Sequence, residues 1–126
     1  DMSLIKVQDF NVATVYVDDF EEGLKFYTEV LGIEKTVPQG PGVLLNANNQ
    51  LTIYLEGGRQ KKSDALSQTP ETCLCFWPEC GVKKAYELMK EAGVTLVGEY
   101  MDCGETFHMY RCADPSGNVI EIAGKP

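Results

Sequence analysis

The sequence lacks an excess of basic residues, long apolar runs and, apart from His108, histidine. Nineteen acidic residues outnumber eleven lysines and arginines, which gives a formal net charge of −8. This balance argues against nucleic acid and anionic membranes as partners, because both select for clustered basic residues. No apolar run approaches the length needed to span a bilayer. The N-terminal stretch also lacks the basic start and apolar core of a secretory signal, so we expect a cytoplasmic protein.

The five cysteines lack the pattern of a disulfide framework. Their number is odd, and 126 residues are enough for a single domain with a core of its own. Cys73 and Cys75 are separated by one residue, whereas zinc and thiol-redox motifs separate their cysteines by two. We therefore interpret the cysteines as small hydrophobic residues buried in strands.

Two segments of the chain repeat one order of predicted elements, β-α-β-β-β. In the first, valine, threonine and tyrosine give strand character before a helix, and the predicted elements cover residues 11–17, 19–32, 33–37, 42–47 and 50–56. In the second, they cover residues 72–77, 82–93, 95–101, 107–113 and 118–124. We therefore expect one domain over residues 1–126, with units at about 8–57 and 71–124 and a polar linker at 57–70.

Local signals mark both predicted helices. Asp19 and Glu22 have the spacing of a capping box, and Gly32 and Gly93 stand where left-handed glycines end helices. The apolar stripe of the first helix comprises Phe20, Leu24, Tyr27 and Leu31. That of the second comprises Val82, Ala85, Tyr86, Met89 and Ala92.

Two motifs resemble those of a known superfamily. After the first strand, Asp19 precedes Phe26-Tyr27 and then Leu31-Gly32, and the segment DPSGNVIEI at residues 114–122 closes the second unit. This order is similar to the vicinal oxygen chelate superfamily, which includes glyoxalase I, extradiol dioxygenases, and fosfomycin and bleomycin resistance proteins. The resemblance implies an α+β fold whose two curled sheets form an open, barrel-like cavity for a ligand. It does not imply one activity, since the superfamily places many chemistries on this scaffold.

The metal positions implied by the resemblance are mostly occupied by residues that bind metals poorly. They fall on Val12, near Tyr54, near Thr72 and on Glu121, and only Glu121 is a carboxylate. A shift of one residue introduces no histidine; it brings in Asn11, Glu71 or Cys73. We therefore expect no metal or other cofactor, because stable sites combine several converging ligands. A divalent ion held by Glu56, Glu121 and waters is the alternative.

Strand alternation predicts which side chains would line the cavity. The candidate ligand-binding residues are Val12, Thr14, Tyr16, Thr52, Tyr54, Glu56, Thr72, Leu74, Phe76, Arg111 and Glu121. Glu121 would be a partly desolvated carboxylate near Tyr16, Tyr54 and Val119, with a ligand offsetting its charge unless Arg111 reaches it. The alternative is that these side chains fill the barrel and no ligand binds.

The acidic, aromatic lining favours a metal-free small-molecule-binding protein similar to the bleomycin resistance proteins, with a cationic or aromatic ligand. One alternative is a glyoxalase-like or dioxygenase-like enzyme with an altered metal site around Glu121. Another is a metal-free isomerase or lyase that uses Glu121 or His108 as its general base. We expect a homodimer, because the open sheet edges need cover, and Trp77 in the core or the dimer interface.

Overall fold

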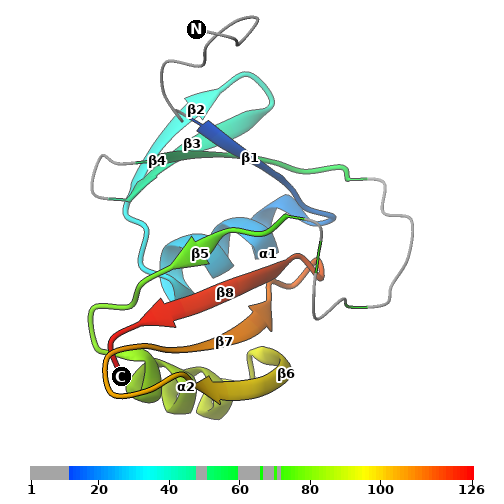
Figure 1. Cartoon of the computed structure of the whole chain (residues 1–126). Coiled ribbons are helices and arrows are strands. Elements are labelled where there is room, and N and C mark those ends of the chain that lie inside the picture. The colour runs from blue at the N-terminus through cyan, green and yellow to red at the C-terminus, as the bar shows by residue number, and fades with distance from the viewer. Residues whose placement is uncertain (1–11, 48–50, 60–65, 67–69, 71) are drawn as a thin grey trace, which may run out of the picture. The chain divides into compact units, whose positions relative to one another are not determined.

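The computed structural model describes residues 12–47, 51–59, 66, 70 and 72–126 (Figure 1). The chain divides into two compact units, residues 1–60 and residues 61–126. Each unit contains helix and a four-stranded mixed sheet, so the prediction of an α+β chain with two β-α-β-β-β units is confirmed. In the part of the chain described, no helix has the length and apolar character needed to cross a membrane.

The first unit contains one mixed sheet, here called sheet A. Its strands are β1 (Val12–Tyr16), β2 (Lys35–Gln39), β3 (Gly42–Ala47) and β4 (Leu51–Glu56). Their order is β1-β4-β3-β2, with β1 parallel to β4 and the other neighbours antiparallel (Figure 1). A parallel pair requires a long connection between its strands, and the helix of this unit lies in that connection.

The helix of the first unit changes its pitch halfway. It begins as α1 (Phe20–Lys25) and continues as the π-helical η1 (Phe26–Val30), where the Leu31 N–H donates to the Phe26 carbonyl at 3.0 Å. Asp19 caps it by accepting the Glu22 N–H at 3.0 Å, as predicted. Gly32, with a φ of +74°, follows the helix as predicted.

The buried stripe of this helix differs from the predicted one. Its buried residues are Gly23, Phe26 and Tyr27, whereas Phe20, Leu24 and Leu31 are only half-buried. The wider π-turn changes the angular spacing of the side chains, so two consecutive aromatic residues are both buried. Gly23 allows close approach to the strand side of the unit, since a Cβ there would lie 2.8 Å from a Val17 methyl group. The sheet contributes Val15, Leu45, Ile53 and Leu55 to the buried residues.

The second unit contains a second mixed sheet, here called sheet B. Its strands are β5 (Cys75–Phe76), β6 (Thr95–Asp102), β7 (His108–Ala113) and β8 (Val119–Gly124), in the order β5-β8-β7-β6. Strand β5 is parallel to β8 and is much shorter than the predicted strand over residues 72–77. Thr72 lies in a bend, and Pro78, which has no N–H to donate, follows closely after the strand.

Helix α2 (Val82–Glu91) packs on β7 and β8. It buries Val82, Ala85 and Met89 as predicted, but Ala92 is exposed because the helix ends there. The buried Tyr110 hydroxyl donates to the Met89 sulfur at 3.1 Å. These contacts define the face of sheet B that packs on α2, so Arg111 and Glu121, which pair one position along from Tyr110 and Ile122, lie on the other face.

Candidate functional site

A tight turn after β7 precedes the strand that carries Glu121. The Asp114 carboxylate accepts the N–H groups of Ser116 and Asn118 at 2.9 Å, and the Asn118 side-chain amide donates to its other oxygen at 2.8 Å. The two strands joined by this turn pair in a register that places Arg111 directly opposite Glu121. The turn signal in the sequence thus leads to a specific cross-strand pair.

Arg111 and Glu121 form an ion pair on the face of sheet B opposite α2. Both Nε and Nη2 of Arg111 lie 3.0 Å from Oε2 of Glu121. The two side chains are 21% and 23% exposed, so the pair is largely shielded from water. From the sequence, we expect a lone Glu121 carboxylate unless Arg111 reaches it. Arg111 does reach it, so the charge of Glu121 is already offset within the protein.

A row of side chains crosses sheet B at this pair. Cys75 lies opposite Glu121 on one side, and Val97 lies opposite Arg111 on the other. Burial, the nearby negative charge of Glu121 and a hydrogen bond to that carboxylate raise the pKa of the Cys73 thiol. Cys75 is exposed, but partial desolvation of its thiol and the same charge also raise its pKa. Both thiols therefore stay protonated at neutral pH and act as weak hydrogen-bond donors.

The facing predicted for β5 is wrong. Phe76 pairs with Ile122, which places it on the α2 side of sheet B, whereas Cys75 shares the side of Glu121. By alternation Leu74 also points away from Glu121, and Thr72 lies in an exposed bend before the strand. Both faces of this segment are apolar, so its hydrophobic pattern did not specify which side chains share the face of Glu121.

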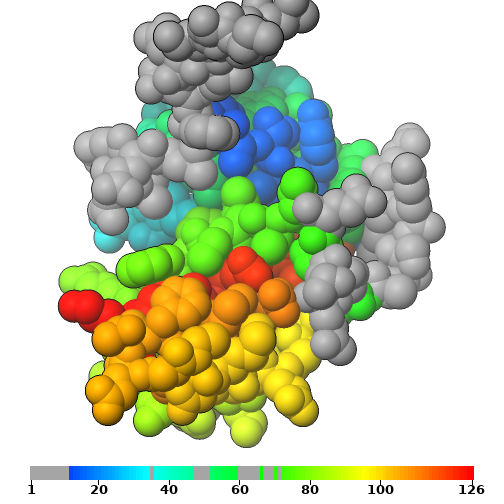
Figure 2. Space-filling model, viewed as in Figure 1, coloured from blue at the N-terminus to red at the C-terminus, as the bar shows by residue number. Residues whose placement is uncertain are grey.

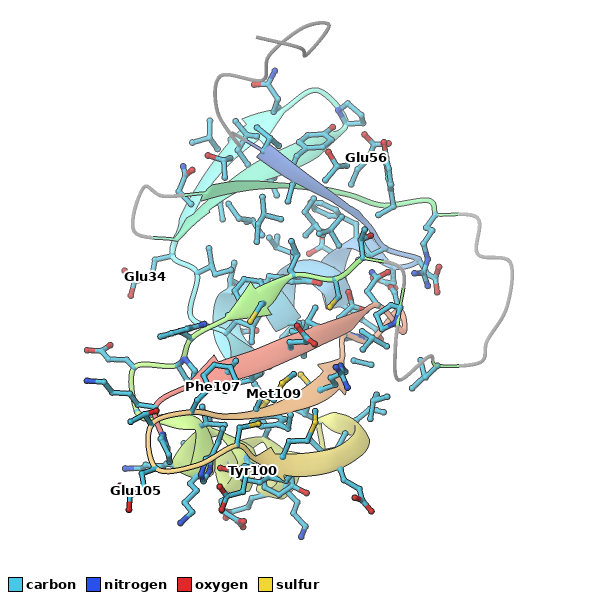
Figure 3. All side chains as sticks on the ribbon, in the orientation of Figure 1. Glu34, Glu56, Tyr100, Glu105, Phe107 and Met109 are labelled. Carbon is cyan, nitrogen blue, oxygen red and sulfur yellow. The ribbon has the colours of Figure 1, made fainter. Side chains whose placement is uncertain are left out.

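Apolar side chains adjoin the ion pair. Val97, Ala113 and Val119 are buried and form one hydrophobic cluster. Met109, labelled on β7 in Figure 3, lies two residues before Arg111 and therefore on the same face. In Figure 2 the strands of sheet B form adjacent bands, green β5, red β8, orange β7 and yellow β6. The face of sheet B opposite α2 thus combines one ion pair and two thiols with a cluster of apolar side chains.

His108 lies on the other face of sheet B, so the two candidate catalytic residues do not share a site. It is 4% exposed and lies three residues before Arg111 on β7. Side chains an odd number of residues apart in a strand point to opposite faces of the sheet. Its Nδ1 lies 2.6 Å from the Tyr100 hydroxyl, and its Nε2 lies 3.0 Å from Oδ1 of Asp102. A hydrogen bond from the Gly104 N–H is the main cause that lowers the pKa of Asp102, and the nearby His108 contributes.

Six candidate residues share the face of sheet A away from its buried side. The register pairs Val12 with Thr52, Thr14 with Tyr54, and Tyr16 with Glu56. Val12 and Tyr16 are 53% and 50% exposed, while the partners on β4 are half-buried. This is the alternation predicted from the sequence, and it leaves two tyrosines and one carboxylate accessible on one sheet face.

The Tyr54 hydroxyl contacts both Glu56 on its own strand and the end of strand β2. The hydroxyl donates to Glu56 at 2.8 Å and lies 3.3 Å from the Gln39 carbonyl oxygen. The hydrogen bond to Glu56 is the largest cause that raises the pKa of Tyr54, so the phenol remains a donor. Gly42 was missed by sequence reasoning, yet a Cβ there would clash with the Leu55 carbonyl oxygen and lie 2.8 Å from Cζ of Tyr54. The close approach of strand β4 therefore requires a glycine at this position, and the Tyr54 ring also lies against it.

Other residues of the two faces were also missed. The Thr52 hydroxyl donates to Oδ1 of Asn46 on the neighbouring strand at 2.7 Å. Cys73 and Cys75 stand beside Glu121, and the C-x-C spacing was the available signal, because residues two apart share a strand face. Of the five cysteines only Cys112 is buried, so the expectation of buried cysteines holds for that one alone.

Trp77 does not lie in the core, since this side chain is 69% exposed, so the dimer interface remains the predicted place for it. Its ring lies next to Gly124, where a Cβ would be 3.1 Å away, and tilts against Phe107 with 6.2 Å between ring centroids. A tryptophan that is the only one in a chain is a weak signal for burial, because its large ring often stays partly exposed.

The donor set does not fit a divalent-metal centre of the kind the superfamily resemblance implied. Val12, Tyr54 and Thr72 offer no anionic ligand at neutral pH, and Oε2 of Glu121 accepts from Arg111. A guanidinium beside this carboxylate would repel a divalent cation. Within the residues described, no three histidine, cysteine, aspartate or glutamate side chains come together as a metal site would require.

One protein-family model matches most of the chain. Residues 9–122 match the family described as Glyoxalase/Bleomycin resistance protein/Dioxygenase superfamily. An integron cassette protein from Vibrio cholerae is similar in structure, with 24% identity, a TM-score of 0.66 and coverage of 96% of this chain and 98% of that chain.

Two further solved structures have the same fold. A virulence protein from Salmonella typhimurium has 23% identity and a TM-score of 0.68, with 97% of this chain and 100% of that chain covered. A glyoxalase/dioxygenase from Nostoc punctiforme has 15% identity and a TM-score of 0.71, with 98% and 99% covered. At these identities the likeness concerns the fold alone.

Proposed function

Because this chain belongs to the glyoxalase/bleomycin resistance protein/dioxygenase superfamily, we propose that it binds a small organic molecule without a tightly held metal ion. Superfamily membership leaves the activity open, so the proposal depends on the site residues. One observation carries it: the guanidinium of Arg111 engages Glu121, the one family metal position that retains a carboxylate.

The ion pair disfavours a metal for a physical reason. A metal bound to Glu121 would have to compete with two Arg111 nitrogens at 3.0 Å or tolerate a positive charge within a few ångströms. Divalent ions bound through oxygen ligands gain their affinity from several such ligands, often anionic. The other family positions supply a valine, a tyrosine and a threonine, which do not offset this repulsion.

The proposed ligand carries a cationic or aromatic group that binds the exposed face of sheet A. Tyr16 and Tyr54 provide flat rings, and Glu56 provides a negative charge on the same face. Glu56 accepts a hydrogen bond from Tyr54, which holds the carboxylate beside a ring without neutralising it. Rings and a carboxylate together suit an amine-bearing aromatic compound through stacking, cation–π attraction and a charge-assisted hydrogen bond.

An enzyme with an altered metal site around Glu121 is the alternative, and elemental analysis separates the two. The protein would be purified without chelator, dialysed, and analysed for nickel, zinc, iron and manganese. We expect far less than one metal ion per chain. About one retained ion per chain would refute the metal-free proposal. A metal-free reaction with His108 as general base is not favoured, because both ring nitrogens already have partners.

The ligand proposal is tested with a thermal-shift screen of cationic aromatic compounds and basic antibiotics. Hits are then titrated against wild type, Glu56→Gln and the control Glu34→Gln, which changes an exposed carboxylate of the same unit that lies apart from Glu56 (Figure 3). A charge-assisted hydrogen bond is worth roughly 1.5–3 kcal/mol, so Glu56→Gln should weaken binding by about ten- to a hundredfold. Equal affinities for all three proteins would show that Glu56 is not the anchor.

A further inference from the structure

We propose that Arg111 recognises a carboxylate group of a ligand on sheet B. This inference rests on the proposed binding function, but it concerns the other sheet and the opposite charge, so the two can fail separately. The sequence placed Arg111 among the candidate ligand-binding residues and close enough to reach Glu121. The geometry shows the contact with Glu121 and leaves the side chain equipped to bind a ligand as well.

The orientation of the guanidinium is the first step. A guanidinium has five N–H bonds in a planar fork. Nε and Nη2 both address one oxygen of Glu121, so a single carboxylate oxygen holds the side chain in place. Within the described part of the chain, the structure gives Nη1 no hydrogen-bond partner. A second carboxylate could therefore bind the remaining edge of the fork without displacing Glu121.

The polar groups around the pair are the second step. Cys73 and Cys75 stay protonated because partial desolvation and the charge of Glu121 raise the pKa of each thiol. The one carboxylate in the row across sheet B already accepts from Arg111. The Cys73 thiol already donates to Glu121, so the donors still available beside the pair are the Cys75 thiol and the remaining edge of the Arg111 fork. Their complement is an acceptor that carries negative charge.

The apolar surroundings restrict the ligand further. Val97, Ala113 and Val119 are buried on the same face as Arg111, and the half-buried Met109 is the apolar side chain beside Arg111 that a ligand can still contact. A free inorganic anion would gain nothing from Met109, whereas an organic acid could place an aromatic or aliphatic body against it. The ligand class that fits this face is therefore a carboxylic acid with an apolar body.

The test compares acids with uncharged analogues of the same shape. Benzoate and 2-naphthoate, each paired with its primary amide, would be titrated at millimolar concentration into wild type, Arg111→Lys and Arg59→Lys. Arg59 is a matched control, because its Nε lies 3.1 Å from an Asp18 oxygen in a similar ion pair on the first unit. The side-chain Nε–H resonance of Arg111 would be followed in wild type by nuclear magnetic resonance.

We expect at least one acid to bind wild type more tightly than its amide and to shift the Arg111 Nε–H resonance. Arg111→Lys keeps the charge but loses the planar fork, and should weaken acid binding by about tenfold or more, while Arg59→Lys has no effect. Equal binding of acids and amides, unchanged affinity in Arg111→Lys, or an Arg111 resonance unmoved by every acid would each overturn the proposal. The resonance measurement decides even if Arg111→Lys folds poorly.

Discussion

Removing the Arg111–Glu121 ion pair should cost more stability than removing a comparable pair elsewhere in the chain. The perturbation is a double-mutant cycle that combines Arg111→Gln and Glu121→Gln singly and together. The reference is the same cycle at Arg59 and Asp18, whose side chains are 18% and 36% exposed. The Arg111–Glu121 side chains are 21% and 23% exposed, so the carboxylate of this pair is the better shielded of the two.

The expected magnitude follows from the geometry. Opposite charges about 4 Å apart attract by about 4 kcal/mol at an effective dielectric constant of about 20, before other costs. Desolvation and the ordering of two long side chains offset much of this, and exposed pairs retain only about 0.2–1 kcal/mol. Two N–H groups at 3.0 Å on a carboxylate that is 23% exposed should retain more than the contacts of 3.1 and 3.4 Å on the Asp18 carboxylate, which is 36% exposed. We expect a coupling free energy of about 1–2 kcal/mol for Arg111–Glu121 and about 0.5 kcal/mol for Arg59–Asp18.

Urea unfolding followed by far-ultraviolet circular dichroism would measure both cycles. Thermal unfolding gives a second measurement. An unfolding entropy of about 2.1 cal/mol/K per residue implies that each 1 kcal/mol of lost stability lowers the Tm of a chain of this length by about 4 °C. Added salt should weaken the Arg59–Asp18 coupling more, because exposed charges are screened more strongly. A coupling at Arg111–Glu121 no larger than that at Arg59–Asp18 would refute the reasoning.

Two further predictions concern the whole chain. Burial raises the pKa of the Cys112 thiol from 9.0 to about 12, so its contribution to stability is complete below pH 9 and is lost as the pH rises toward 12. The free energy of unfolding, measured with urea, should fall by up to about 1.4 kcal/mol per pH unit in that window. Cys112→Ala should reduce this slope, whereas the control Cys103→Ala, at an exposed site, should not. Equal slopes in both variants would contradict the prediction. We also expect a homodimer, because the sheets have open edges; light scattering at micromolar concentration should give twice the 14.0 kDa chain mass, and a monomer mass would rule it out.

The sequence by itself determined the features that depend on neighbouring residues. Asp19 caps the first helix, Gly32 and Gly93 follow the two helices with positive φ, and the turn at Asp114 forms with Gly117 left-handed. The alternation on sheet A was also predictable, because Tyr16, Tyr54 and Glu56 stand in strands with one clearly apolar face. Each of these signals acts over a few residues, where backbone geometry and hydrogen bonding leave few choices.

Tertiary structure decided the features that depend on which residues meet across strands. Both faces of the segment before Trp77 are apolar, so only pairing with β8 showed that Cys75, rather than Phe76, accompanies Glu121. The partners of His108 and Glu121 likewise come from the registers of β6, β7 and β8. The sequence shows that Glu121 carries a charge, but it does not show which side chains surround that charge in the folded protein. Contact with a guanidinium 10 positions away changes what it can bind, because electrostatic interaction depends on distance in space and on shielding from water.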